Sequence, residues 1–285
     1  MAYVQNIEAS SPGGVGAVAF TGSWPTISDG GTFSPTTSAL ITGPREAVLV
    51  DAQYLKRDVA ELGDVIEGSG KRLTTIVITH GHADHYLGFA ELLKRFPGAR
   101  AVATPAVIED LLASMPRQEQ TWRNWFGDRH VAFAGAPDPL EGSTIDVDGF
   151  AVEIVDLKQA DISPTTAAHV PELGLVVAGD AVYNEIHAML ALTTPEQWEG
   201  WIASVDAIEK LNPTFVVGGH KRPEATLDAQ PQLDATRRYI RDYADTVATS
   251  ESSDEAVARM VTLYPDYGNT WTLRISANAY FANRA

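Results

Sequence analysis

The sequence contains no cysteine among its 285 residues. Disulfide bonds, thiolate ligands and a cysteine nucleophile are therefore excluded, and a bound metal ion would have to use histidine and carboxylate side chains. Basic residues are also scarce, since 21 Lys and Arg against 37 Asp and Glu give a formal net charge of -16. This acidic balance favours solubility and repels phosphate backbones, which argues against a nucleic-acid partner.

Long apolar runs are missing as well. No stretch reaches the length needed to span a membrane, and Met1 to Ala19 lacks a basic start followed by a continuous apolar run. We therefore expect a cytoplasmic protein without a membrane partner, while secretion of a processed form stays compatible with the sequence. The length and the 45% hydrophobic content fit one domain over residues 1–285. Its core would span about 16–223 and a helical C-terminal extension about 231–285, and we find no internal repeat.

Strand and helix patterns alternate along the chain. The first half predicts a Ser/Thr/Gly/Pro-rich loop over Ser23–Thr37 and a helix through Leu55, Val59, Leu62 and Ile66. The predicted strands are Gly16–Gly22, Ser38–Thr42, Ala47–Val50, Leu73–Thr79, Ala101–Thr104, Thr144–Val155, Thr165–Val170, Gly174–Ala178 and Phe215–Val217. The other predicted helices are Gly88–Phe96, Pro105–Ala113, one after Pro195, Leu233–Ala248 and Asp254–Leu263. Such alternation is typical of a layered α/β protein.

One aromatic segment interrupts this alternation. From Met115 to Phe133, the side chains Trp122, Trp125 and Phe126 lie close together among arginines. They could form a helical face that packs on the body of the protein, or a lid or wall over a substrate pocket.

Four of the seven histidines, His80, His82, His85 and His220, follow predicted strands. Loops beyond strand ends bring distant residues together in open α/β proteins. The segment His80-Gly81-His82-Ala83-Asp84-His85 places three imidazoles and one carboxylate directly after a buried strand. A divalent metal needs such donors at about 2.0 to 2.2 Å, and the small residues between them reduce crowding. Alternation directs His80 and His82 to one side and Asp84 with His85 to another, which predicts two adjacent metal positions.

The HxHxDH pattern after an apolar strand resembles the signature of the metallo-β-lactamase superfamily. Further similar positions are His169 in Ala168-His169-Val170, Asp180 in Val176-Val177-Ala178-Gly179-Asp180, and His220 in Gly218-Gly219-His220. Asp51, at the end of Val48-Leu49-Val50-Asp51, resembles the acidic residue that braces the metal loop. The resemblance spans about residues 16–223 and implies a four-layer αββα sandwich with extra C-terminal helices.

The same resemblance implies a ligand set. One zinc ion would be bound by His80, His82 and His169, a second by Asp84, His85 and His220, and Asp180 would lie between them. Unlike the Gly-rich His-Thr-Pro-Gly segment of the family, the run Thr165-Thr166-Ala167-Ala168 precedes His169, and Pro171 follows it. Asp51 would fix the tautomer of a ligand histidine from outside the ligand set.

Two divalent ions would lower the pKa of a bridging water, so a metal-bound hydroxide could attack an ester or lactone carbonyl. Asp84 could accept the proton and pass it to the leaving group. We therefore expect a dinuclear zinc-dependent hydrolase. Manganese, iron and cobalt also suit this donor set.

The substrate is a small molecule that the fold alone does not select. Tyr183, three residues after Asp180, resembles a tyrosine of lactonases of this fold, and its phenol could donate to the substrate carbonyl or oxyanion. Asn184 and His187 follow it and could line the pocket, although His187 also suits a surface or core position. A lactonase or esterase is favoured. A β-lactamase, a thioesterase similar to glyoxalase II and a non-catalytic metal-binding protein are the alternatives. The apolar C-terminal helices could finish the core or form a homodimer face.

Overall fold

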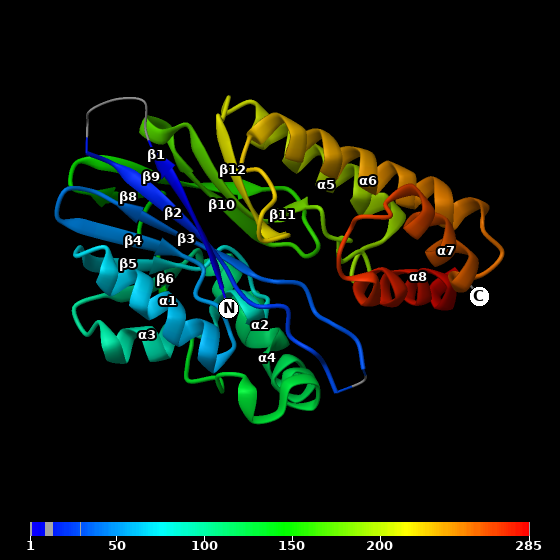
Figure 1. The fold of residues 1–285 in the computed structure, drawn as a ribbon, viewed down its shortest axis with the longest axis horizontal. Helices are drawn as coiled ribbons and strands as arrows, with labels where there is room; N and C mark the ends of the chain where they lie inside the picture. The colour runs from blue at the N-terminus through cyan, green and yellow to red at the C-terminus, as the bar shows by residue number, and fades with distance from the viewer. Residues whose placement is uncertain (1, 9–13, 29, 285) are drawn as a thin grey trace.

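A computed structural model describes residues 2–8, 14–28 and 30–284 of the protein. Met1 and Asp29, which fall within the predicted domain and the predicted loop over Ser23–Thr37, lie outside the described residues. The described chain forms two β-sheets that face each other, with helices outside each sheet (Figure 1).

The first sheet has seven strands in sequence order. They are β1 (Tyr3–Glu8), β2 (Gly16–Thr21), β3 (Thr37–Thr42), β4 (Glu46–Val50), β5 (Arg72–Val77), β6 (Arg100–Ala103) and β7 (Asp138–Pro139). Pairing is antiparallel from β1 to β4 and parallel from β4 to β7. The carboxyl ends of β4 and β5 therefore lie side by side, which places the loops after them together.

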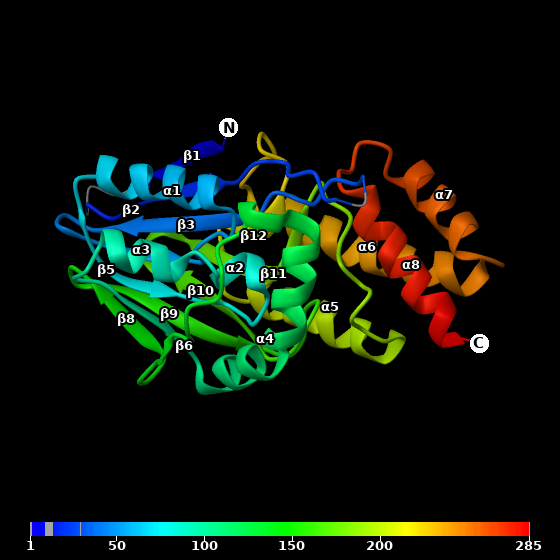
Figure 2. The same ribbon diagram turned by 90° about the horizontal axis from the view of Figure 1, so that it is seen from below.

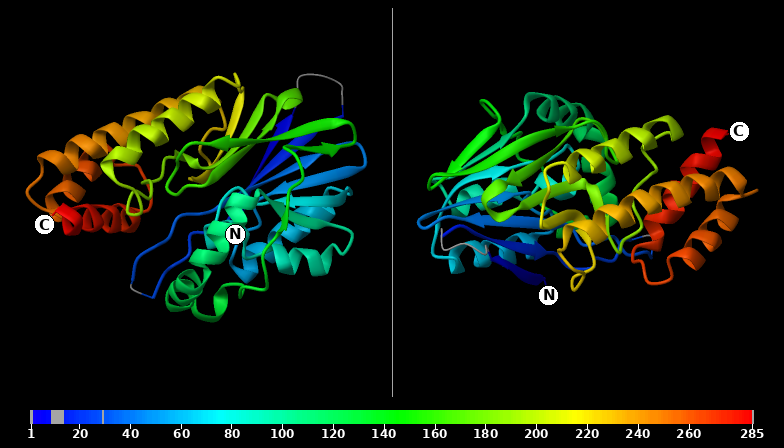
Figure 3. Two further views of the ribbon diagram at one scale, coloured as in Figure 1. Left: turned by 180° about the vertical axis from the view of Figure 1, so that it is seen from behind. Right: turned by 90° about the horizontal axis from the view of Figure 1, so that it is seen from above.

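The second sheet has five strands in the order β12-β11-β10-β9-β8. They are β8 (Thr144–Val147), β9 (Phe150–Leu157), β10 (Thr165–Val170), β11 (Leu175–Asn184) and β12 (Phe215–Lys221). The β11–β12 pair is parallel and the other pairs are antiparallel. Figure 3 shows this sheet facing the first one across a common interior.

Aliphatic side chains fill the space between the sheets. Val48, Val50 and Val77 of the first sheet belong to one buried cluster with Val152 and Val177 of the second. All five are at most 3% exposed, so both sheets are buried on this face. Burial of this apolar area is the main force that holds the two sheets together.

Helices on the outside of the first sheet cover its other face. They include α1 (Lys56–Gly68) and α3 (Phe89–Arg95), while α2 (Ala83–Tyr86) and α4 (Pro105–Phe126) lie nearer the strand ends (Figure 2). In α1, Val59, Leu62 and Ile66 recur at helical spacing and pack into one cluster with Leu49 and Ile76 of the sheet.

The C-terminal helices cover the second sheet and extend beyond it. They are α5 (Pro195–Glu209), α6 (Ala229–Thr249), α7 (Ser253–Leu263) and α8 (Thr270–Arg284). Val176 and Val216 of the sheet pack in one cluster with Trp201 of α5 and Ile240 of α6. The predicted αββα sandwich with extra C-terminal helices is thus confirmed, while the single-domain interpretation stays a prediction.

Several element boundaries differ from the sequence predictions. The strand β1 was not predicted, and the strand predicted over Thr144–Val155 is a hairpin that turns at Asp148 and Gly149, both with positive φ. Helix α4 continues through Pro116 to Phe126 instead of ending at Ala113. Two short 3-10 helices span Gly127–Arg129 and Pro171–Leu173.

Within the described ranges, none of the helices combines the length and apolarity required to cross a bilayer. The predicted cytoplasmic location stays a prediction.

Candidate metal centre

The loop that follows β5 carries the histidine motif. His82 has an extended backbone just before α2, and Asp84 and His85 lie within this one-turn helix, so the two halves of the motif point to different positions. Gln118 of α4 holds the loop from the side: its Nε2 donates to the Gly81 carbonyl at 2.7 Å, and its Oε1 accepts from the Ala83 amide at 2.8 Å. These two bonds fix the turn that separates the ligands.

One group of potential metal ligands consists of His80, His82, Asp161 and Asp180, whose donor atoms all lie within 4.8 Å of one another. His82 Nδ1 lies 2.7 Å from Asp161 Oδ2, and His80 Nε2 lies 3.9 Å from Asp180 Oδ2. Asp161 comes from the loop between β9 and β10, and Asp180 from the middle of β11.

The second group consists of Asp84, His85 and His220, within the same 4.8 Å limit. His220 lies near the end of β12, and its Nε2 lies 3.3 Å from Asp84 Oδ2 and 3.4 Å from Asp180 Oδ2. His85 Nε2 lies 3.1 Å from Asp180 Oδ1. Asp180 therefore lies between the two groups, as the sequence resemblance implied.

The structure does not bring His169 into either group, which corrects the sequence prediction. Its Nδ1 lies 3.0 Å from Glu153 Oε2 on the neighbouring strand β9. The first residue of β10, Thr165, forms an isolated β-bridge with His80. His169 lies four residues further along, about 13 Å away at the usual rise per residue. Asp161, just before the strand, occupies the position expected for the third histidine.

Asp51 braces the histidine loop as expected. Its Oδ2 lies 2.8 Å from His85 Nδ1, and its Oδ1 accepts from the Thr79 amide at 2.9 Å. Asp51 has φ of 59°, an uncommon conformation for a residue other than glycine that turns its carboxylate back toward the loop. An aspartate bonded to Nδ1 leaves Nε2 of His85 free to face Asp180 and a metal ion.

Replacing Asp51 with asparagine should weaken metal affinity by about 10- to 100-fold, because the carboxylate no longer orients His85. Metal titration by calorimetry measures this change. Asp148→Asn is a matched control, since Asp148 also has positive φ but sits in a turn bonded to the Arg45 amide. Equal metal affinities for the two variants would refute the role of Asp51.

His220 and Asp84 are held by the loop that precedes β3. His220 Nδ1 lies 3.0 Å from both Ser34 Oγ and the Pro35 carbonyl, and Thr36 Oγ1 donates to Asp84 Oδ2 at 3.0 Å. A Cβ on Gly219 would lie 2.0 Å from Asp180 Oδ1, so the approach of β12 to β11 requires glycine at this position.

Burial and mutual charge shift the titration of these groups. Burial lowers the pKa of His80 well below its ordinary value. For His82 and His220 burial acts in the same direction, but the carboxylates outweigh it: Asp161 raises the pKa of His82 to about 9, and Asp180 raises that of His220 to about 10. Burial raises the pKa of Asp161 to about 6. The histidines and carboxylates thus compensate one another's charge in this buried cluster.

The donor set fits divalent metal ions. Among the described residues, His80 Nε2 is buried without a hydrogen-bond partner, and His85 Nε2 and Asp180 Oδ1, 3.1 Å apart, have none outside their own ion pair. Buried polar atoms are rarely left unpaired, and these three face the interior of the cluster. Imidazole nitrogens and carboxylate oxygens in two groups of four and three residues could hold two ions, and they suit zinc, manganese, iron or cobalt.

A cavity of about 360 Å³ opens over both groups. Trp122 and Trp125 line it as predicted, although Trp122 is only 6% exposed and also packs in the core. The predicted pocket residues Phe126, Asn184 and His187 are not among its lining residues. Phe126 is a core residue, Asn184 Nδ2 donates to the Thr226 carbonyl, and His187 Nδ1 lies 3.0 Å from Tyr239 Oη. Their assignment to the pocket is corrected, because each side chain is committed to packing or to an internal hydrogen bond. Phe126 and His187 are buried, which is the core position that the sequence also allowed for them.

Tyr183 lines the cavity from β11. Its phenol donates to Asp180 Oδ2 at 2.7 Å, and its ring stacks on His220 with 5.3 Å between centroids. Burial and the charge of Asp180 raise the pKa of the phenol well above its ordinary value. The hydroxyl therefore keeps its proton at neutral pH and donates it to Asp180.

Four residues of the candidate site were not singled out from the sequence: Asp161, Gln118, Ser34 and Phe33, the last of which lines the cavity. Asp161 had a signal, because it precedes the predicted strand Thr165–Val170, whereas His169 lies inside that strand. Gln118, Ser34 and Phe33 act through tertiary contacts that no sequence spacing reveals.

The chain belongs to the metallo-β-lactamase superfamily, since the family model of that description matches residues 31–220, more than half of the chain. A hydroxyacylglutathione hydrolase from Acidiphilium cryptum (strain JF-5) is 29% identical over 168 residues. The match covers 58% of this chain and 57% of that relative, so the chain spans little more than half the length of this curated protein.

Solved structures share the fold at low sequence identity. A metallo-β-lactamase from Pontibacter korlensis is 19% identical, with a TM-score of 0.60 over 84% of this chain and 99% of that one. A metallo-β-lactamase family protein from Thermus thermophilus is 17% identical, with a TM-score of 0.61 over 99% of this chain and 93% of that one. These likenesses establish the fold.

Proposed function

We propose that the protein is a metal-dependent hydrolase that opens an ester or lactone bond. The observation that carries the proposal is the pair of ligand groups that meet at Asp180 on the floor of a single cavity. Divalent ions bound there would activate a water molecule and polarise a carbonyl oxygen. Membership of the superfamily and the hydrolase relative support this reaction class.

The chain's own groups complete the site. Asp84 lines the cavity, and its Oδ2 is held by Thr36, so it is placed to accept a proton from the attacking water and pass it to the leaving group. Tyr183 keeps its phenolic proton, which it donates to Asp180 Oδ2 in this structure, and that proton would have to turn to the substrate carbonyl as negative charge develops. Phe33 and Trp122 exclude water from one side of the cavity, which strengthens these interactions.

Tyr183→Phe should lower kcat on esters or lactones by about 10- to 100-fold, because the ring still stacks on His220 while one donor is lost. Metal content should stay unchanged. Tyr243→Phe is the control, since its buried hydroxyl has no partner among the described residues and does not line the cavity. An unchanged kcat in the Tyr183 variant would dismiss the proposed role.

A thioesterase is the second candidate, favoured by the similarity to the hydroxyacylglutathione hydrolase from Acidiphilium cryptum. A hydrolysis screen on zinc- and manganese-loaded protein separates the candidates. Lactones, aryl esters, S-lactoylglutathione and nitrocefin are the substrates. The proposal expects turnover of an ester or lactone, and turnover of the thioester or of nitrocefin alone would contradict it.

A further inference from the structure

The cavity over the metal centre has a lining of two chemical kinds. Helix α4 contributes polar side chains, among them Asp110, Arg117 and Gln118. The remaining wall outside the metal centre is largely apolar: Phe33, Trp122, Trp125, Met189, Leu192 and Ile275. Ile275 belongs to α8, so the C-terminal extension, which lies outside the part matched by the family model, helps to form this wall.

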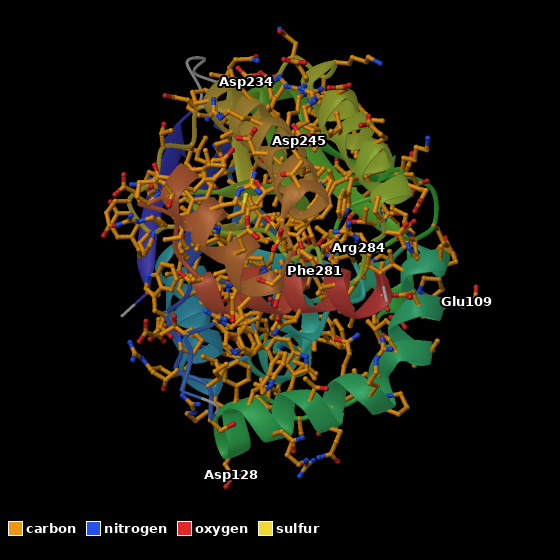
Figure 4. All side chains as sticks on the ribbon, turned by 90° about the vertical axis from the view of Figure 1, so that its right-hand side faces the viewer. Glu109, Asp128, Asp234, Asp245, Phe281 and Arg284 are labelled. Atoms are coloured by element: carbon orange, nitrogen blue, oxygen red, sulfur yellow. The ribbon has the colours of Figure 1, made fainter. Side chains whose placement is uncertain are left out.

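Aromatic contacts connect the apolar wall directly to the metal centre. Phe33 packs edge to face on His220, with 5.8 Å between ring centroids, and on Trp122 at 5.4 Å. Trp125 meets Trp271 of α8 edge to face at 4.8 Å. Figure 4 shows α8 lying between α6, which carries Asp234 and Asp245, and α4, which carries Glu109. The wall is therefore a packed surface that begins beside a ligand and ends on α8.

The described side chains around the cavity offer an anionic substrate few cationic partners. Among the described residues that line it, Arg117 is the one Lys or Arg, its side chain is exposed, and Asp110 lies on the same helix. Two divalent ions would bring four positive charges against three carboxylates, those of Asp84, Asp161 and Asp180. A histidine at position 161 would leave one more positive charge in the centre, so Asp161 itself weakens the attraction for anions.

We propose that the cavity selects an uncharged ester or lactone whose apolar acyl group lies against the wall of Phe33, Trp125 and Ile275. This inference rests on the proposed hydrolase function and names its substrate class. The cavity volume of about 360 Å³ is near the lower limit for small-molecule sites, so the acyl group is short to medium in length.

The direct test is a pair of esters that differ by one charge. 4-Nitrophenyl hexanoate and the 4-nitrophenyl half-ester of adipic acid have acyl chains of equal carbon number, but the second ends in a carboxylate. On metal-loaded protein, kcat/KM for the neutral ester should be at least about 10-fold higher. In a series of neutral 4-nitrophenyl esters that starts with the acetate, each added methylene group should raise kcat/KM by up to about fourfold until the acyl chain fills the cavity. Equal or faster turnover of the charged ester would overturn the inference.

Two lysine variants on α8 test the wall itself. Ile275→Lys places a cation at the cavity and should reduce the preference for the neutral ester by about 10-fold. Asn278→Lys adds the same charge on an exposed position of the same helix and should leave the preference unchanged. Should Ile275→Lys fail to fold, Ile275→Ala should reduce the gain in kcat/KM per methylene. An unchanged preference in both lysine variants, or an unchanged gain in the alanine variant, would overturn the role of α8.

Binding provides a readout that does not depend on turnover. Hexanamide and adipic acid monoamide differ by the same single charge as the two esters. Because Trp122 and Trp125 line the cavity, tryptophan fluorescence should detect binding of either amide, and the neutral amide should bind at the lower concentration. If the amides show this preference but no ester or lactone is hydrolysed, the proposed function fails and the selectivity stands. If esters are hydrolysed without preference, the selectivity fails and the proposed function stands.

Discussion

Asp161→Ala is expected to lower kcat/KM by at least about 100-fold and to reduce the metal content of the purified protein. Loss of a partner outside the ligand set already costs about 10- to 100-fold in affinity or activity, so loss of a ligand should cost more. The variant also removes the carboxylate that lies 2.7 Å from His82 Nδ1, so His82 loses its orientation as well. Elemental analysis and ester or lactone kinetics on the same samples measure both effects.

His169→Ala is the matched comparison for Asp161→Ala. His169 contacts Glu153 and belongs to neither ligand group, so metal content should be unchanged and kcat/KM should stay within about twofold. The opposite pattern, with loss of metal from the His169 variant and not from the Asp161 variant, would restore the assignment made from sequence.

His82→Ala is expected to abolish measurable turnover, with a loss of about 1,000-fold or more. Its imidazole is one of four side chains in the first group, and its absence leaves Asp161 as an uncompensated buried carboxylate. The second group, Asp84, His85 and His220, remains intact, so metal content should fall by about one ion per chain instead of to zero.

Elemental analysis combined with kinetics tests the His82 variant. The circular dichroism spectrum should match that of the wild type, because the side chain lies in a loop and is partly exposed. His130→Ala provides a control for loss of a histidine elsewhere, since His130 Nδ1 contacts the Gly127 carbonyl and the residue belongs to neither group. Full activity in the His82 variant would show that the first group plays no part in turnover.

Much of the fold could be predicted because the hydrophobic patterns are strong. The β-branched run that ends at Thr79 and the helical spacing of Leu62 and Ile66 both identify elements that the structure contains. The end of α4 could not be predicted, because Pro116 removes one backbone donor and normally interrupts a helix. Packing of Trp122 on Phe33 and Tyr54 accompanies the continuation of this helix to Phe126, and such contacts are not visible in the sequence.

The ligand clusters were predictable to the extent that they follow local spacing. His80 and His82 fall in one group and Asp84 with His85 in the other, as their alternation indicated. Asp161 replaces His169 as a candidate ligand because β10 begins beside His80, at Thr165. The sequence could not show this, because strand register is set by pairing between distant segments.

The pocket residues were the least predictable part of the site. Trp125 was expected from its aromatic neighbours, but the cavity wall also includes Phe33 from an N-terminal loop and Ile275 from the last helix. Phe33 and Ile275 are more than two hundred positions apart in the sequence, and both line the cavity, near which Trp271 of α8 contacts Trp125 of α4. The composition of the cavity wall therefore depends on the tertiary fold, whereas the composition of the metal loop follows from six consecutive residues.

We propose that the protein hydrolyses its substrate through metal ions bound at the two groups. The most direct measurement is metal content and turnover on the same sample before chelation, after chelation and after restoration of the metal. We predict between one and two transition-metal ions per chain, loss of ester or lactone turnover on chelation, and recovery of turnover when zinc or manganese is returned. Metal-free protein with undiminished activity would contradict it.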